Sequence, residues 1–134
     1  MTTIAPYGSW TSPITAAQAA AVSGQPHWTE FVGDEVWWVE PRTAEGGRCT
    51  VMRQTPDGPQ ELLPAPWNAR NRVHEYGGQP WTAVDGVLIF THWDDQRVYA
   101  LRDGPGGPDG PQPLTPEPER KHGLRYSDLQ RGLP

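Results

Sequence analysis

The chain has 134 residues, of which fifteen are glycine and sixteen are proline, and its formal net charge is −5. So many residues that interrupt secondary structure exclude long helices. The acidic charge and the scattered arginines argue against a nucleic-acid partner, which would need a basic patch. Apolar residues make up only 35%, but seven tryptophans and four tyrosines indicate a folded chain of short strands rather than a disordered one.

The sequence shows no pattern of a membrane segment, a secretory leader or a disulfide. No stretch approaches the ~18 apolar residues that cross a bilayer, and no basic start is followed by an apolar run. Cys49 is the single cysteine, so no internal disulfide can form. We therefore expect a cytoplasmic protein without a membrane partner.

One helix is expected, near the N-terminus. Thr15 and Gln18 have the spacing of a capping box, and Ala16 to Val22 is a run of good helix formers. Gly24 is a suitable stop at its C-terminal end. Because an alanine-rich helix of this length buries little apolar surface of its own, we expect it to pack against another part of the protein.

Short strands separated by turn residues follow from Pro26 onward. The first group is predicted over residues 27–31, 35–40, 49–54 and 60–63, with turns at 33–34, 44–47 and 57–58. The centre of its second strand, Val36 to Val39, is apolar throughout, which predicts burial on both faces.

A second group repeats the first. Its strands are predicted over residues 79–84, 87–92, 97–101 and 112–115, with a flexible loop over 104–110. Residues 36–39 align with 87–90 at an offset of 51, and residues 62–64 align with 114–116 at an offset of 52. Four short antiparallel strands that recur at about 50 residues are typical of propeller blades. The predicted fold is therefore all-β, with about two four-stranded antiparallel blades of an incomplete propeller preceded by one short N-terminal helix.

This reading divides the chain into four parts. They are an N-terminal extension with the short helix (1–25), a first blade (26–66), a second blade (67–118), and a last segment (119–134) that either starts the next blade or is a truncated tail. Two blades cannot close a ring, because propellers need roughly 4–8. We therefore expect either a longer parent protein or self-association.

Several motifs resemble one family of peptidases. They are residues 6–10 (Pro-Tyr-Gly-Ser-Trp), 72–78 (Arg-Val-His-Glu-Tyr-Gly-Gly), 95–99 (Asp-Gln-Arg-Val-Tyr) and 114–116 (Leu-Thr-Pro). Together they resemble bacterial members of the prolyl oligopeptidase family, the acylaminoacyl-peptidase-like and dipeptidyl-peptidase-like serine peptidases. The resemblance implies an N-terminal propeller that gates the access of peptide substrates to a C-terminal α/β-hydrolase domain with a Ser-Asp-His triad.

The residues of this chain offer no catalytic site of their own. A nucleophile of the α/β-hydrolase type needs the pattern G-x-S-x-G. The four serines lack that pattern: Ser9, Ser12, Ser23 and Ser127. His92, Asp94 and Asp95 are interpreted as part of a turn rather than as metal ligands, and no cofactor is predicted. Whether the parent is an enzyme rests on the resemblance, and the chain alone should be inactive.

The candidate substrate-facing residues are Arg72, His74, Glu75 and Tyr76. They precede the first strand of the second blade, and the innermost strand of a blade lines the central channel. Glu75 would attract the amino terminus of a substrate, and Arg72 a carboxylate. The alternative role is structural: His74 and Tyr76 would form hydrogen bonds between blades, and the glycines at 77–78 would allow a close backbone approach.

Three functions are compatible with these observations. The first is a non-catalytic propeller segment of a serine peptidase that gates substrate access. The second is a stand-alone binding or scaffold module that closes a propeller by oligomerisation. The third is a propeller enzyme of another type, for which this segment supplies no clear set of carboxylate metal ligands.

Overall fold

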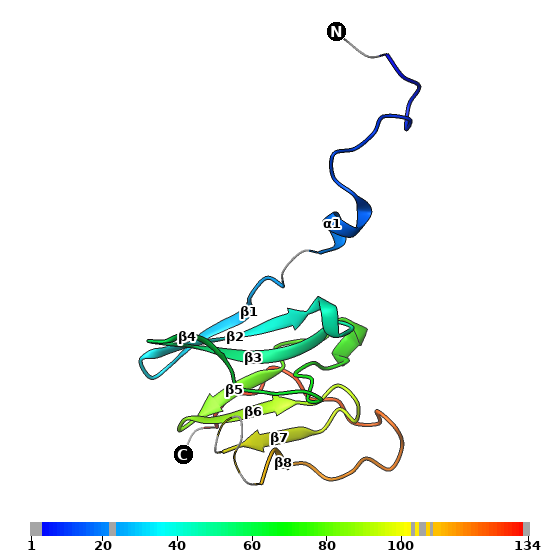
Figure 1. Cartoon of the computed structure of the whole chain (residues 1–134). Helices are drawn as coiled ribbons and strands as arrows, with labels where there is room; N and C mark the ends of the chain where they lie inside the picture. The colour runs from blue at the N-terminus through cyan, green and yellow to red at the C-terminus, as the bar shows by residue number, and fades with distance from the viewer. Residues whose placement is uncertain (1–3, 22–23, 103, 105–106, 108, 133–134) are drawn as a thin grey trace.

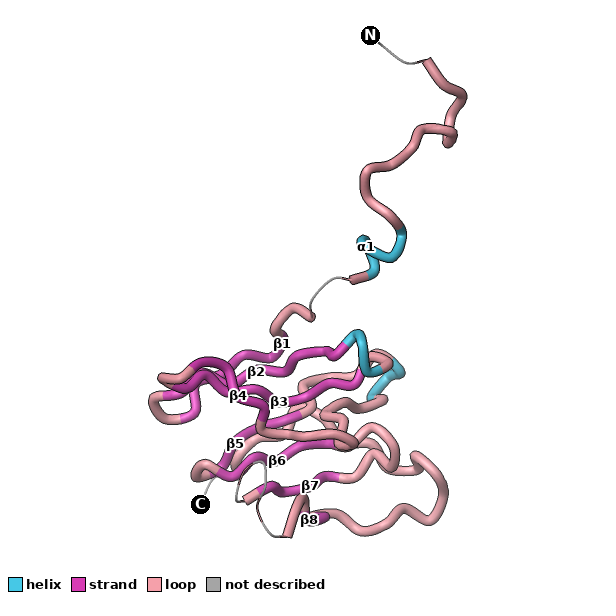
Figure 2. Tube along the Cα trace, viewed as in Figure 1, coloured by secondary structure: helices cyan, strands magenta, loops and turns pink. Residues whose placement is uncertain are grey.

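The computed structural model describes residues 4–21, 24–102, 104, 107 and 109–132. Within them, the strands form two four-stranded antiparallel sheets in chain order, β1-β2-β3-β4 and β5-β6-β7-β8 (Figure 1). Neither sheet closes on itself, and the two are stacked face to face (Figure 2). The prediction of an all-β, incomplete propeller is confirmed.

The elements lie within a few residues of their predicted positions. The first sheet contains β1 (His27–Val32), β2 (Glu35–Arg42), β3 (Arg48–Thr55) and β4 (Gly58–Glu61). The second contains β5 (Trp81–Val84), β6 (Val87–Thr91), β7 (Val98–Leu101) and β8 (Gln112–Pro113). Two short 3-10 helices, η1 (Thr43–Glu45) and η2 (Val73–Glu75), lie at one end of the sheets (Figure 2). Of the loop predicted over 104–110, residues 105, 106 and 108 lie outside the described part of the chain.

The only α-helix of the described residues, α1 (Ala16–Ala20), begins with the predicted capping box. The Thr15 hydroxyl accepts a hydrogen bond from the Gln18 N–H (3.1 Å), and Gln18 Oε1 accepts one from the Thr15 N–H (2.8 Å). The helix ends at Ala20, well before Gly24, and Val22 lies outside the described residues.

The expectation that this helix packs against another part of the protein is wrong for the described residues. None of the residues of α1 is buried. The arm formed by residues 4–21 projects away from both sheets (Figure 1). Alanine faces offer too little apolar area to hold so short a helix against a sheet.

The core lies between the two sheets. Its buried members are Trp37, Val39, Val51, Leu62, Leu63, Ala69, Trp81, Leu88, Phe90, Tyr99 and Leu101. Residues 62–80 form the connecting segment between the two sheets. Its Trp67 packs edge-on against Phe90 and Tyr99, with ring centroids 5.9 and 4.9 Å apart. The connecting segment therefore seals one side of the core.

Strand β2 is buried on one face only, contrary to the prediction. Trp37 and Val39 are 4% and 3% exposed, whereas Val36 and Trp38 are half-buried. The reason is that the second sheet covers one face of β2, and among the described residues no sheet covers the other.

The two blades repeat at a spacing of 52 residues. The predicted alignment of residues 36–39 with 87–90, at an offset of 51, therefore pairs residues on opposite faces of the two sheets. The two-residue turns at 33–34 and 85–86 occupy the same place in each sheet, 52 positions apart. At offset 51, Trp37 aligns with Leu88. Both are buried in the same core, but Trp37 points from the first sheet and Leu88 from the second. Because side chains alternate along a strand, a slip of one residue exchanges the faces.

Among the described residues, α1 has five residues, and no helix there has the length and apolarity needed to cross a bilayer.

Candidate functional site

The loop of residues 72–78 is held closed by two buried amide side chains. Asn71 Oδ1 accepts hydrogen bonds from the N–H groups of Val73 (3.3 Å) and Gly78 (2.9 Å), and its Nδ2 donates to the Gly78 carbonyl (3.2 Å). Gln96 Oε1 accepts from the Arg72 N–H at 2.7 Å. Because Asn71 and Gln96 are 2% and 0% exposed, the loop is anchored from inside the protein.

This anchoring presents three of the four candidate residues to solvent. His74 and Glu75 have φ angles of 51° and 62°, in the left-handed region that non-glycine residues rarely adopt. His74, Glu75 and Tyr76 are all exposed, Tyr76 at 94%. The side chains of His74 and Tyr76 form no hydrogen bond with another described residue, so the inter-blade bonds of the structural alternative are not present there.

Glu75 is paired with two arginines of its own chain. It forms an ion pair with Arg125 and a second, at 3.7 Å, with Arg72. Arg125 also donates to the Arg72 carbonyl at 2.7 Å. The hydrogen bond from Arg125, followed by the charge of that arginine, lowers the pKa of the Glu75 carboxyl. The structure therefore brings Arg72 and Glu75 together.

Arg72 lies against an aromatic ring rather than in open solvent. Its guanidinium carbon is 4.1 Å from the centroid of the Trp93 ring, and that of Arg70 is 4.4 Å from the same ring. The two arginines and Trp93 form one cation–π cluster beside the loop.

The glycines at 77–78 do allow a close approach of the chain, as the structural alternative supposed. A Cβ on Gly78 would lie 2.7 Å from Asp128 Oδ2, and one on Gly77 would lie 3.0 Å from the Asn71 carbonyl oxygen. The Asp128 N–H donates to the Gln79 carbonyl at 2.9 Å. The C-terminal segment therefore docks directly against the loop.

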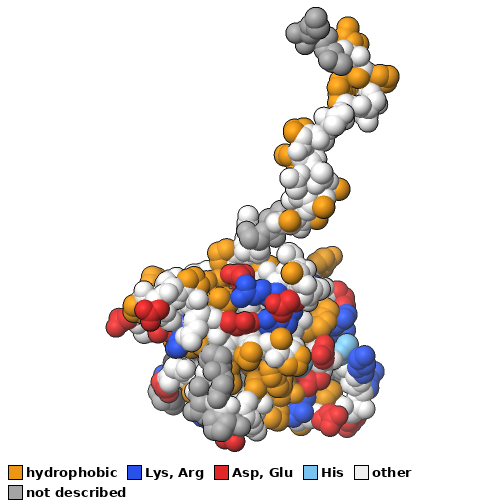
Figure 3. Space-filling view, viewed as in Figure 1, with side chains coloured by type: hydrophobic (Ala, Val, Ile, Leu, Met, Phe, Trp, Pro, Cys, Tyr) orange, Lys and Arg blue, Asp and Glu red, His pale blue; other side chains and the backbone are white. Residues whose placement is uncertain are grey.

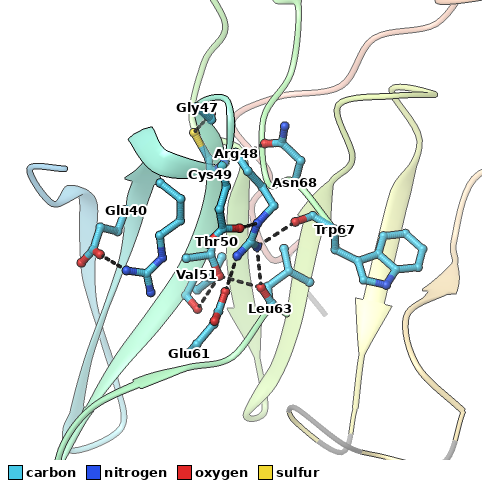
Figure 4. Close-up of polar contacts among 12 residues, drawn as sticks. Glu40, Gly47, Arg48, Cys49, Thr50, Val51, Glu61, Leu63, Trp67 and Asn68 are labelled. Atoms are coloured by element: carbon cyan, nitrogen blue, oxygen red, sulfur yellow. Dashed lines mark hydrogen bonds and ion pairs between the residues drawn. The ribbon is translucent and has the colours of Figure 1, made fainter. Parts of the chain in front are cut away.

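A buried arginine, which the sequence did not indicate, binds the first sheet to the segment that leads to the second (Figure 4). The side chain of Arg48 is 9% exposed, and its Nη1 donates to the carbonyls of Leu63 and Trp67, both at 3.1 Å. It also pairs with Glu45 (2.6 Å) and Glu61 (2.7 Å). Burial lowers the pKa of Arg48, but its bonds to these two carboxylates outweigh burial and raise it.

Neighbouring residues of β3 strengthen the same junction. Thr50 Oγ1 donates to the Leu63 carbonyl at 2.6 Å, and the Cys49 N–H donates to Asn68 Oδ1 at 2.9 Å (Figure 4). The connecting segment is thereby fixed to the first sheet while its Trp67 packs on the second.

The remaining candidates have local partners. Ser9 Oγ donates to the Pro6 carbonyl and Ser127 Oγ to Asp128 Oδ2, each at 2.6 Å. Ser23 lies outside the described residues. His92 Nε2 lies 3.6 Å from Asp94 Oδ2, and in the described part of the chain no three His, Cys, Asp or Glu side chains are grouped as metal ligands.

The solved structures that are similar to this chain include three of hydrolases or peptidases. A crystal structure of puromycin hydrolase is 51% identical, with a TM-score of 0.77, over 95% of this chain and 20% of that one. A mutant of puromycin hydrolase complexed with PGG is 52% identical, with a TM-score of 0.77, over 92% and 20%. A puromycin-hydrolyzing peptidase of Mycobacterium tuberculosis is 45% identical, with a TM-score of 0.79, over 92% and 19%.

Neither a family model nor a curated protein matches the chain. The chain spans about a fifth of the length of the solved structures that it matches. The high identity extends over nearly the whole of this chain, in agreement with the resemblance of its motifs. In both sequence and fold, the chain therefore matches an N-terminal propeller segment of a prolyl oligopeptidase-family peptidase.

Proposed function

We propose that this chain is the non-catalytic N-terminal propeller segment of a bacterial, cytoplasmic serine peptidase. In the parent protein it gates the access of peptide substrates to a C-terminal α/β-hydrolase domain. The observation that carries the proposal is the coverage: 51% identity over 95% of this chain but only 20% of a hydrolase. The G-x-S-x-G pattern is missing from this sequence, so the nucleophile would belong to the rest of the parent chain.

The exposed N-terminal arm supports the proposal that another domain of the parent protein contacts this segment. Ile4, Tyr7, Trp10 and Ile14 are 94%, 98%, 57% and 62% exposed, and apolar side chains are spaced along the arm (Figure 3). Burial of apolar surface is worth about 25 cal/mol per Å². An arm of this kind is suited to contact the hydrolase domain of the same parent chain.

Gating requires blades that keep their relative positions, and the Arg48 junction and the core supply that rigidity. The test compares short and long peptide substrates in the parent peptidase. Trp37→Ala, which loosens the interface between the blades, should raise kcat/KM for long peptides relative to short ones. Trp37→Phe, the matched control, should keep the ratio of the wild type. An unchanged ratio in Trp37→Ala would refute the gating role.

The absence of catalysis is tested on the chain alone. Purified residues 1–134 should not hydrolyse peptide or ester substrates. Turnover that disappears when one of the four serines is replaced by alanine would contradict the proposal.

The second candidate, a module that closes by oligomerisation, is favoured by the two open sheets and by Phe31, which is 82% exposed on β1. Light scattering on the purified chain distinguishes the oligomeric module from the segment of a longer protein. A defined oligomer would favour the module, and weak, non-specific association the segment of a longer chain. A compact monomer with a cooperative melt at high temperature would contradict both.

A further inference from the structure

A groove of about 440 Å³ opens beside η2, at the end of the two sheets. Its buried lining residues are the apolar Val39, Ala69 and Pro80 and the polar Asn71, whose side-chain amide is bonded to the backbone of Gly78. Two aromatic side chains also line it and remain accessible: Trp28 is 48% exposed and Tyr76 is 94% exposed. The groove therefore offers a largely apolar floor and two aromatic rings to a ligand, and its volume lies within the usual range of small-ligand sites.

Strained backbone holds both aromatic residues in place. Trp28 has a φ of 52°, at a point where the pairing of β1 with β2 slips between His27 and Glu30. Its carbonyl accepts a hydrogen bond from Trp81 Nε1 at 3.1 Å, which fixes this bulge. Tyr76 follows directly after the two positive-φ residues of η2. Bulges re-aim side chains, and strain of this kind gathers at ligand sites.

The charge of the groove is one-sided. Arg70 lines it, and no aspartate or glutamate is among its lining residues, although the chain as a whole is acidic. Arg70 forms no ion pair with a described residue. Its guanidinium lies over Trp93, and a guanidinium stacked by its face keeps its N–H groups available at the edge. Burial raises the pKa of the Cys49 thiol in the groove, and the positive charge of Arg70 opposes that rise.

We propose that this groove binds the carboxyl-terminal end of a peptide. Arg70 pairs with the terminal carboxylate, and the adjoining apolar side chain lies against Trp28 and Tyr76. The charged partner is thus Arg70 and not Arg72, whose guanidinium is already paired with Glu75. This inference rests on the proposed function, because it takes peptides to be the substrates of the parent protein.

The test measures binding to the full 134-residue chain by calorimetry, with Gly-Gly-Phe as the free acid and as the C-terminal amide. A charge-assisted hydrogen bond should make the free acid bind roughly tenfold or more tightly. Arg70→Gln should abolish that preference, and Arg70→Lys should retain part of it. The matched control is Arg102→Gln, an exposed arginine outside this groove, which should leave the preference intact. Tyr76→Ala should weaken both peptides alike.

Equal affinities for the two peptides, no binding of either, or a preference that survives Arg70→Gln would each overturn the proposal. Equal melting temperatures of Arg70→Gln and the wild type show that the variant is folded. If the two melting temperatures differ, the proposal is judged instead on Arg70→Lys and on the relative affinities of the wild type for the acid and the amide.

Peptide hydrolysis by the parent protein distinguishes this inference from the proposed function. If the parent hydrolyses acid and amide with equal KM, the groove proposal fails and the function stands. If Arg70-dependent binding occurs in a parent that hydrolyses no peptide, the function fails and the groove proposal stands.

Discussion

The indole rings of Trp37 and Trp81 stack across the interface between the two blades, with centroids 6.0 Å apart and planes inclined by 25°. Next to this stack, Gln79 donates a side-chain hydrogen bond to Glu30 of β1. The first strand of the second blade is thus attached to the first blade by both packing and polar contacts. Because these contacts join residues 44 and 49 positions apart in the sequence, the stability of one blade depends on the other.

Truncation of the stack should destabilise both blades together. Trp37 is 4% exposed, and Trp37→Ala removes a buried aromatic ring, which typically costs about 3–5 kcal/mol. Trp10→Ala, at a residue 57% exposed in the arm, should change the free energy of unfolding by less than about 0.5 kcal/mol. Urea unfolding followed by circular dichroism measures the free energy of unfolding of both variants. Similar losses in the two would show that the Trp37–Trp81 stack contributes no more to stability than an exposed residue of the arm.

The Arg48 junction should not tolerate lysine. Lysine cannot reproduce the planar set of donors that serves two carboxylates and two carbonyls, so Arg48→Lys leaves a buried acceptor unsatisfied. The expected loss is about 1–3 kcal/mol. Arg53→Lys is the matched control, because the side chain of Arg53 is 32% exposed on the same strand. Equal destabilisation in the two variants would argue against the junction.

Tyr99 should ionise at a higher pH than an ordinary tyrosine. Burial, together with its 2.5 Å hydrogen bond to Asp95, raises the pKa of Tyr99 to about 12. A raised pKa contributes stability that is fully present below the unfolded value of about 10 and is lost as the pH rises towards 12. Titration of the absorbance at 295 nm should show a late phase that Tyr99→Phe removes. Completion of all tyrosine ionisation below pH 11 would disprove the shift.

Local patterns were sufficient to predict the strands, the turns and the helix cap. Two-residue turns and capping boxes are encoded by neighbouring residues, so the hairpins and Thr15 could be placed from sequence. The repeat could be placed only to within one residue, because an apolar run aligns equally well in either register. Burial of β2 on one face depended on what lies beyond the sheet, which no local pattern contains.

The residues that fix the candidate site gave no sequence signal. Arg48 donates to a carbonyl nineteen positions away, and Gln96 accepts from an N–H twenty-four positions away. Both partners are backbone groups, which every residue has, so nothing at Trp67 or Arg72 indicates the contact. Arg70 was missed for a related reason: its place in the groove depends on the packing of β1 against the connecting segment.

Glu75 should titrate below its usual range. Its hydrogen bond to Arg125 lowers the pKa of the carboxyl from the ordinary 4.5. A lowered pKa contributes stability that is present above the unfolded value and is lost as the pH falls through the folded one. NMR titration of the Glu75 carboxyl should show this shift, and Arg125→Gln should reverse most of it. A shift that persists in Arg125→Gln would point to another cause.

The same ion pairs decide what Glu75→Gln should do in the parent peptidase. A carboxylate held by Arg125 and Arg72 has little charge left for a substrate ammonium. We therefore expect KM to change equally for substrates with free and with blocked amino termini, together with a lower melting temperature. Arg125→Gln should reproduce the melting effect, because it breaks the same pair. A rise in KM of tenfold or more that is confined to substrates with a free amino terminus would instead assign Glu75 to substrate recognition.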